Sequence, residues 1–436
     1  MDIIIKATQL FLSLSILILI HEFGHFMAAR IFKTRVEKFY LFFNPWFSLF
    51  KFKRGETEYG LGWLPLGGYV KIAGMIDESM DKEAMKLPAQ PYEFRSKPAW
   101  QRLIIMLGGI IMNVFLGIFI YWMLLFFRGE EYIPTANVKY GIAVDSVGWE
   151  MGFQNGDKIL AVDGQPVENF SRIPSAIILN MAKKVTVERN GQQVDIPIDQ
   201  SMIKKAIDTK TIDFVSIRMP FVIKAFSPGS AAKDAGMEVN DQVIAINNQP
   251  AYYYDEVRKQ LFANKGQTVD ISFLRSNDTL SKKVKLTSEG MLGVQAALPD
   301  EFMQSKVIQY TFLGALPAGI RKAYETLTNY IKQFSLIFSS KVQGYKHVGG
   351  FISIANAFEP KWDWISFWSF TGFLSIALAF MNLLPIPALD GGHVLFTLYE
   401  MVTRRKPNEK FLEYAQIAGM IILLTLMVYA NGSDIV

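Results

Sequence analysis

The stretch LIIMLGGIIMNVFLGIFIYWMLLFF, residues 103–127, holds 25 consecutive uncharged residues and decides the fold class. A second uncharged run of 25, ISFWSFTGFLSIALAFMNLLPIPAL, covers residues 365–389. At a rise of about 1.5 Å per residue, either run is long enough to cross a hydrocarbon core of about 30 Å. Both are predicted to be membrane spans, and the two prolines near the end of the second must break its helix.

Two shorter runs predict further spans. Residues 414–431 form an uncharged run of 18, whereas the run at residues 7–20 has only 14 before it reaches His21, Glu22 and His25 and then becomes apolar again. A secretory signal peptide is disfavoured for this first run, because no small-residue cleavage site follows it. We therefore predict four spans, the first with charge inside it.

The composition separates this chain from ordinary cytosolic enzymes. Of its 436 residues 50% are apolar and 19% are charged, and cysteine is absent. The absence of cysteine excludes thiol proteases, cysteine zinc sites and disulfides from the chain. The net charge of +5 is small, and Lys and Arg cluster beside the spans, so no nucleic-acid partner is expected.

The loops between the spans predict the orientation. Thirteen Lys and Arg lie between residues 30 and 102, and four more lie at residues 404–410. Because basic loops stay on the cytoplasmic side, both termini and the long segment 128–364 are predicted to lie on the opposite face. That face is the periplasm if the cell is a Gram-negative bacterium.

The long segment contains an internal repeat. Five residues recur 84 positions later: Gly152, Asp157, Ala161, Gln165 and Pro166 become Gly236, Asp241, Ala245, Gln249 and Pro250. Each copy reads as a strand, a turn, a short helix and another strand, at 184–189 and 268–275. We predict two similar α+β domains, followed by an amphipathic helix at 319–341. Before the second span, GWLPLGGYVK at 62–71 predicts a hairpin loop, as does the aromatic segment 39–52.

The sequence HEFGH at residues 21–25 matches the H-E-x-x-H pattern. On a helix, His21 and His25 lie on one face and can hold one metal, with Glu22 within reach of a metal-bound water. The alternative is a pair of His at the membrane interface. A carboxylate at this depth is costly unless it is paired or functional, so Glu22 disfavours that alternative.

Asp390 is the best candidate for a third metal ligand. It follows the prolines that end the third span, and the predicted orientation brings it to the same side as His25. The alternative role for Asp390 is a cap of the next helix. His393, three residues on, is either a hydrogen-bond donor to a ligand or a bystander at the interface.

These motifs together resemble the site-2 protease family of intramembrane zinc metalloproteases. The resemblance rests on HEFGH, on LPLGGYVK at 64–71, on Gly108, Gly109 and Asn113 in the second span, and on NLLPIPALDGG at 382–392. It covers nearly the whole chain. It implies a zinc metalloendopeptidase with Zn²⁺ held by His21, His25 and Asp390, with Glu22 as the catalytic acid and base.

The resemblance also implies how substrate is bound and what the substrate is. Asn382 matches a residue that holds substrate, and Gly67, Gly68 and Tyr69 match a membrane-associated β-hairpin that presents substrate as a strand. The two repeats resemble PDZ domains, although the first lacks the sequence SPGSAA that the second has at 227–232. The implied partners are the lipid bilayer and single-span membrane substrates, either an anti-sigma factor after first-site trimming or remnant signal peptides, at the bacterial inner membrane.

The predicted fold is thus a polytopic α-helical membrane protein with four transmembrane helices, a membrane-associated β-hairpin region and two inserted PDZ-like α+β domains. Its predicted segments are 1–34 (first span with HExxH), 35–98 (cytoplasmic-side loop with β-hairpins), 99–128 (second span), 129–212 and 213–292 (PDZ-like domains), 293–362 (amphipathic helical linker), 363–402 (third span with the LDG motif) and 403–436 (fourth span). The alternative function is a catalytically inactive PDZ-bearing membrane scaffold, with a metal transporter behind it. Either would tolerate loss of Glu22, which a protease would not.

Overall fold

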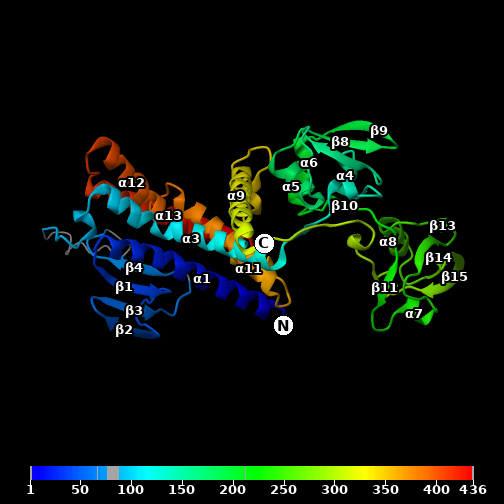
Figure 1. Ribbon diagram of the computed structural model, residues 1–436, viewed down its shortest axis with the longest axis horizontal. Coiled ribbons are helices and arrows are strands. Elements are labelled where there is room, and N and C mark those ends of the chain that lie inside the picture. Colours follow the sequence, from blue (N-terminus) through cyan, green and yellow to red (C-terminus); the bar gives the residue numbers. More distant parts are fainter. Residues whose placement is uncertain (1, 66, 76–87, 212, 435–436) are drawn as a thin grey trace. The chain divides into compact units, whose positions relative to one another are not determined.

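The computed structural model describes residues 2–65, 67–75, 88–211 and 213–434 (Figure 1). The chain divides into two compact units, and each is described by itself. The membrane unit consists of Met1–Gly129, Gln309–Ser335 and Tyr345–Val436, and the inserted unit of Glu130–Ile308 and Leu336–Gly344.

Within the described residues, four helices are long and apolar enough to cross a membrane: α1 (Asp2–Ile31), α3 (Ala99–Arg128), α11 (Trp364–Leu383) and α13 (Glu409–Ser433). The prediction of a polytopic helical membrane protein with four spans is therefore confirmed. Helix α3 packs against both α1 and α11 (Figure 1). It is the element on which the other two are arranged.

Glycine allows α1 and α3 to approach closely. A Cβ atom added to Gly24 would lie 2.2 Å from the carbonyl oxygen of Gly108, and one added to Gly108 would lie 2.5 Å from that of Gly24. Small residues of this kind let helix backbones touch inside membranes, where van der Waals packing replaces the hydrophobic effect as the driving force. The contact places the HEFGH turn directly beside α3.

The third span breaks where its prolines predict. Helix α11 ends at Leu383, and α12 (Asp390–Thr403) begins after a non-helical segment that contains Pro385 and Pro387. The segment packs closely on its neighbours, because a Cβ atom added to Gly419 of α13 would lie 1.7 Å from the Pro387 carbonyl oxygen. Asp390 is therefore held at a fixed place as the first residue of α12.

The chain between the first two spans forms a four-stranded sheet (Figure 1). Its strands are β1 (Val36–Leu41), β2 (Phe50–Arg54), β3 (Thr57–Leu61) and β4 (Tyr69–Ile72), in the order β2-β3-β1-β4. Strands β1 and β3 are parallel, and the other neighbouring pairs are antiparallel. Among the described strands, β4 is the last of this sheet and pairs with β1.

The prediction of a hairpin at residues 62–71 is wrong, because the strands on either side of this segment, β3 and β4, do not pair with each other. The hairpin of this region is formed by β2 and β3, whereas Tyr69–Ile72 pairs with β1, more than 25 residues earlier in the chain. The chain between β3 and β4 connects strands on opposite sides of β1, so it is a crossover and not a tight turn. Proline and glycine indicate irregular backbone here, but they carry no information about a distant pairing partner.

The amphipathic helix is α9 (Phe312–Ile337), which starts earlier than predicted. The Trp122 indole nitrogen on α3 donates a hydrogen bond to the Phe312 carbonyl at 2.7 Å, and Tyr330 meets Phe373 and Phe380 of α11 edge-on. Helix α9 therefore packs against both α3 and α11 (Figure 1). The short helix α10 (Phe351–Asn356) follows it, and Asp434 at the end of α13 accepts hydrogen bonds from the amides that begin α10.

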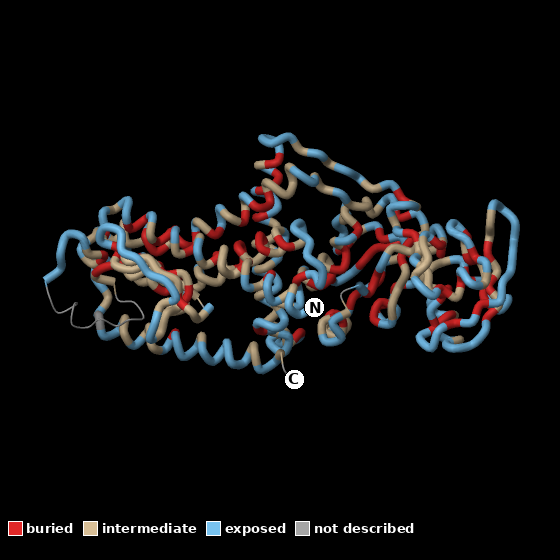
Figure 2. Tube along the Cα trace, turned by 90° about the horizontal axis from the view of Figure 1, so that it is seen from below, coloured by how far each residue is buried: buried red, intermediate tan, exposed pale blue. Residues whose placement is uncertain are grey.

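The inserted unit contains two small α+β domains with separate cores (Figure 2). The first is built from β6 (Ile142–Val144), α4 (Ser146–Glu150), β7 (Lys158–Val162), α5 (Ile173–Leu179), β8 (Lys184–Arg189), β9 (Gln192–Pro197), α6 (Gln200–Asp208) and β10 (Val215–Ile217). The second is built from β11 (Ile223–Phe226), α7 (Ala231–Asp234), β12 (Gln242–Ile246), β13 (Gln249–Pro250), α8 (Tyr254–Ala263), β14 (Thr268–Arg275), β15 (Asp278–Lys285) and β16 (Val294–Ala296). Strands β5 (Glu130–Tyr132) and β17 (Lys306–Ile308) pair where the chain enters and leaves the unit.

The sequence repeat is also a structural repeat. In the first domain Arg189 binds the buried carboxylate of Asp157 and the carbonyl of Gly152. In the second domain Arg275 binds Asp241 and the carbonyl of Gly236 in the same way. The residues that recur in the sequence thus include the carboxylate that anchors the same arginine contact in each copy.

Candidate metal centre

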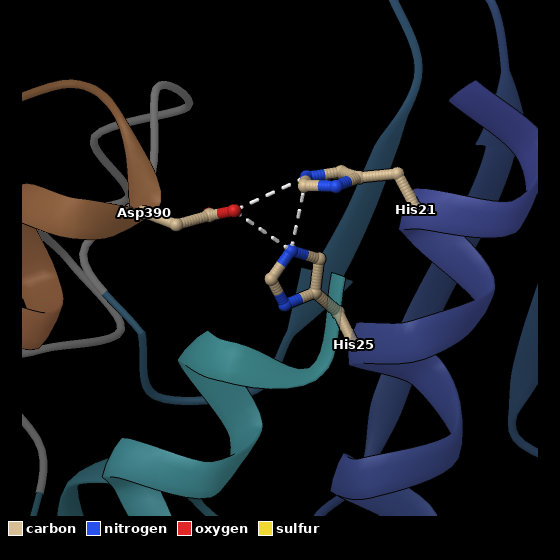
Figure 3. Close-up of side chains that lie close together, drawn as sticks. All are labelled: His21, His25 and Asp390. Carbon is tan, nitrogen blue, oxygen red and sulfur yellow. Dashed lines mark hydrogen bonds and ion pairs between the residues drawn. The ribbon is translucent and has the colours of Figure 1, made fainter. Parts of the chain in front are cut away.

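Three ligand atoms converge where α1 meets α12. His21 and His25 lie one turn apart on the buried face of α1, and Asp390 reaches them from the start of α12 (Figure 3). Asp390 Oδ2 lies 3.1 Å from His21 Nε2 and 3.2 Å from His25 Nε2, and the two Nε2 atoms lie 3.3 Å apart. Two residues of one helix and one from the far end of the chain therefore form a single cluster.

The spacing of these atoms fits a zinc ion. Zinc with ligands at about 2.0–2.1 Å in tetrahedral geometry has ligand atoms about 3.3 Å apart, close to the edges of this triangle. Asp390 Oδ2 is buried and has no hydrogen-bond donor aligned with it. A buried carboxylate oxygen without a donor is costly, and a cation bound among the three atoms removes that cost. Two imidazoles and one carboxylate are also the donor set of catalytic zinc sites with an open fourth position.

Hydrogen bonds on the far side of each ring orient the ligands. His25 Nδ1 lies 2.8 Å from the carbonyl oxygen of Ile105 on α3. A carbonyl only accepts, so Nδ1 carries the proton and His25 Nε2 presents its lone pair to the centre. His21 Nδ1 lies 3.2 Å from the side-chain amide of Asn113, also on α3. Sequence reasoning gave Asn113 no role, and the Ile105 carbonyl, being backbone, leaves no signal in a sequence.

A cavity of about 400 Å³ opens beside the cluster. Glu22 and His393 line it together with the three cluster residues, and strand β4 supplies much of the opposite wall. Gly68, just before β4, lies so close to α1 that an added Cβ atom would be 3.2 Å from Glu22 Cγ. Glu22, the cluster and strand β4 thus line one shared cavity.

Comparison with known proteins decides the family. Residues 9–426 match the profile of Peptidase family M50. The chain belongs to this family, the site-2 proteases. It is 28% identical to Protease RseP of Yersinia pestis, over 100% of this chain and 99% of that protein. It is also 28% identical to Regulator of sigma-E protease RseP of Escherichia coli K12, over 97% of this chain and 96% of that protein, and 27% identical to the protein of the same name of Salmonella typhimurium, with 97% and 96% covered.

The M50 chain is therefore a multi-pass membrane zinc metalloprotease, as the sequence motifs predicted. Asp390 is the first residue of α12, and the capping position is Leu389, so the alternative that Asp390 only caps this helix does not hold. His393 lines the cavity, which leaves both of its predicted roles open. The ligand roles of His21, His25 and Asp390 and the catalytic role of Glu22 remain predictions, now with a geometry that supports them.

The predicted substrate residues lie at different distances from the centre. The Asn382 amide nitrogen, on the last turn of α11, is 3.4 Å from His21 Nε2. Gly68 and Tyr69 line the cavity, and the Tyr69 hydroxyl donates to Asn44 Oδ1 at 2.9 Å. Gly67 is absent from the cavity lining, and its φ of 156° and contact with Phe43 set the path of the chain into β4. The structure brings Asn382, Gly68 and Tyr69 of the M50 protease to the cluster and places Gly67 just outside.

Gly109 of α3 leaves the space that the two imidazoles occupy. A Cβ atom added there would lie 2.5 Å from His25 Nε2 and 2.6 Å from His21 Cε1. We expect Gly109→Ala to displace both rings and to lower zinc affinity by about 10–100-fold, as loss of ligand orientation does elsewhere. Equilibrium zinc competition on the purified protein measures this. Gly432→Ala, where an added methyl group meets open space, is the control and should bind zinc normally.

Proposed function

We propose that this M50 protease cleaves single-span membrane proteins inside the membrane. Zinc is held by His21, His25 and Asp390, and Glu22 is the catalytic acid and base. The observation that supports this proposal most directly is the shared cavity: it contains the three converging ligand atoms, the Glu22 side chain and residues of strand β4. A scaffold protein has no need for such an arrangement.

The proposed chemistry divides between the ion and the chain. Zinc, when bound, makes a water molecule more acidic and polarises the peptide carbonyl. Glu22 takes the proton from that water as the new carbon–oxygen bond forms. The same carboxyl group then gives the proton to the nitrogen of the broken peptide bond, so the two products are a carboxylate and an amine.

Strand β4 is the proposed site of substrate presentation. A helical membrane segment hides its peptide carbonyls in its own hydrogen bonds, so it must unwind before cleavage. In the described part of the chain β4 is the last strand of its sheet and lines the cavity beside the cluster, so an extended peptide is proposed to add to the sheet next to β4. Gly68 and Tyr69 then lie beside the bound peptide, and Gly67 directs the protein chain into β4. The side-chain amide of Asn382 is proposed to donate a hydrogen bond to the backbone of the peptide.

The proposed substrates follow from the relatives. Two relatives carry the name Regulator of sigma-E protease RseP, which supports an anti-sigma factor, after first-site trimming, as the substrate. Remnant signal peptides have the same single-span form and are the second proposed substrate. The basic loops support placing the centre towards the cytoplasm of the bacterial inner membrane, with the two PDZ-like domains in the periplasm. The principal experiment incubates the purified protein in liposomes with a synthetic single-span peptide. Two fragments cut within the apolar segment support the proposal, and zinc binding without any cleavage supports the scaffold alternative.

The two inserted domains are proposed to exclude substrates that still carry a large extramembrane domain. They lie in the chain between α3 and α11, and α11 leads to Asp390. Unfolding a bulky substrate domain to pass them costs about 5–15 kcal/mol, whereas a trimmed stub avoids that cost. We expect replacement of residues 135–290 by a short linker to permit cleavage of an untrimmed substrate, scored by immunoblot. If this variant cuts the trimmed substrate and still spares the untrimmed one, the domains have another role.

A further inference from the structure

Asn113 of α3 lies in the interface with α1, where its side chain meets His21. Its side chain is completely buried, and the amide nitrogen is 3.2 Å from His21 Nδ1. The other end of the amide, Oδ1, is buried without a hydrogen-bond partner. An uncharged amide with one unsatisfied end costs about 1–3 kcal/mol in a protein interior, so its presence here needs an explanation beyond packing.

The contact with His21 has two chemical forms. With the nitrogen of the amide towards the ring, Nδ1 must accept, and the proton of a neutral His21 then sits on Nε2, which points at Asp390. With the amide turned by 180°, Oδ1 accepts from Nδ1–H, and Nε2 is left with a lone pair directed at Asp390 Oδ2 and His25 Nε2. The two ends of an amide occupy nearly the same positions, so the heavy-atom geometry is compatible with either form.

We propose that Asn113 is a positioning residue that sets the tautomer of His21 for zinc, by accepting a hydrogen bond from Nδ1–H when the ion is bound. The inference rests on the proposed zinc site. His25 needs no such residue, because the Ile105 carbonyl already fixes its proton on Nδ1. The two ligands are thus oriented by different groups. His25 is held by a backbone carbonyl, which a substitution does not remove, and His21 by a side chain, which a substitution can change.

Asparagine suits this position because it serves both forms of the ring. Its amide donates to His21 when the ion is absent and accepts when the ion is present. The backbone around Asn113 is held in place, because the Ser375 hydroxyl of α11 donates a hydrogen bond to the backbone carbonyl oxygen of Asn113 at 2.7 Å. Aspartate would only accept, which favours the zinc-binding tautomer, and leucine would do neither.

The test compares zinc affinity in full-length protein carrying Asn113→Leu or Asn113→Asp, by competition with a chromophoric chelator. We expect Asn113→Leu to bind zinc about 10–100-fold more weakly and Asn113→Asp to bind at least as tightly as the parent. The visible spectrum of bound Co²⁺ should change in the leucine variant and stay close to the parent in the aspartate variant. Thr371→Val, which removes the buried hydrogen bond between α11 and Ser13, controls for general loosening of the helices and should keep parental affinity.

The outcomes separate this inference from the proposed function. A parent protein that binds no zinc overturns the zinc site itself. A parent that binds zinc, with a leucine variant of equal affinity, overturns the role of Asn113. If the leucine variant does not fold, the aspartate variant decides, because loss of affinity in a folded protein that still offers an acceptor contradicts the proposal.

Discussion

Glu22→Gln is expected to keep the fold and the zinc and to lose cleavage by about 10²–10⁴-fold, the usual contribution of a general acid–base group. Glutamine has nearly the same shape and can still occupy the cavity wall beside Gly68. It cannot take a proton from water at neutral pH. The loss should therefore appear in kcat, measured by fragment release from a single-span peptide in liposomes.

The control for this variant is Glu37→Gln. Glu37 forms an ion pair with Lys71 on the same sheet, but its side chain is 38% exposed and it is absent from the cavity lining. Exposed ion pairs contribute little to stability, so turnover should be unchanged. Normal turnover by Glu22→Gln, with zinc bound, would assign the proton transfer to another group and return Glu22 to a structural role.

The candidate metal ligands could be predicted from the sequence, because the patterns that indicate them involve residues close together in the chain. The spacing of His21 and His25 is fixed by the helical repeat, and the prolines before Asp390 indicate where a helix must end. The association of Asp390 with the two histidines needed the orientation of four spans as well. That inference worked because a membrane leaves few places for an ionisable group at the end of an apolar run.

The second layer of the site was not predictable, because it depends on contacts between distant segments. Nothing in the sequence distinguishes the carbonyl of Ile105 from any other, and the role of Gly109 follows only from how closely α1 packs on α3. The partner of β4 was missed for the same reason. The apolar alternation of Tyr69–Ile72 indicates a strand, but its pairing with β1 is fixed by tertiary structure.

The two repeats were predicted only in part. Recurrence of residues 84 positions apart identified two similar domains and their strands β7, β8, β12 and β14 without any structure. It did not identify the arginine that binds each buried carboxylate, because Arg189 and Arg275 are 86 residues apart and fall outside the repeat spacing. The offset of two residues reflects a longer connection in the second copy.

Removal of both histidine ligands should abolish zinc binding and the stability that zinc provides. A ligand that binds only the folded state stabilises it by about 2.7 kcal/mol at 100 times Kd and about 4.1 kcal/mol at 1,000 times Kd. We therefore expect zinc to raise the melting temperature of the metal-free parent protein. In His21→Ala/His25→Ala, Asp390 is the one cluster member left, and a single carboxylate does not hold zinc against a chelator.

The measurement is a thermal unfolding series in detergent at increasing zinc concentration, with metal analysis of the same samples. His347→Ala is the matched control, because His347 is absent from the ligand cluster and its loss removes the same side chain. It should keep both the bound zinc and the zinc-dependent shift. The double variant should start from a lower metal-free melting temperature than the parent, because it loses two buried side chains and leaves the Asp390 carboxylate without its partners, so the zinc-dependent shift is compared within each protein. Full zinc occupancy in the double variant would place the ion elsewhere in the chain, and a zinc-dependent shift as large as that of the parent would mean that zinc stabilises the protein through a site other than this cluster.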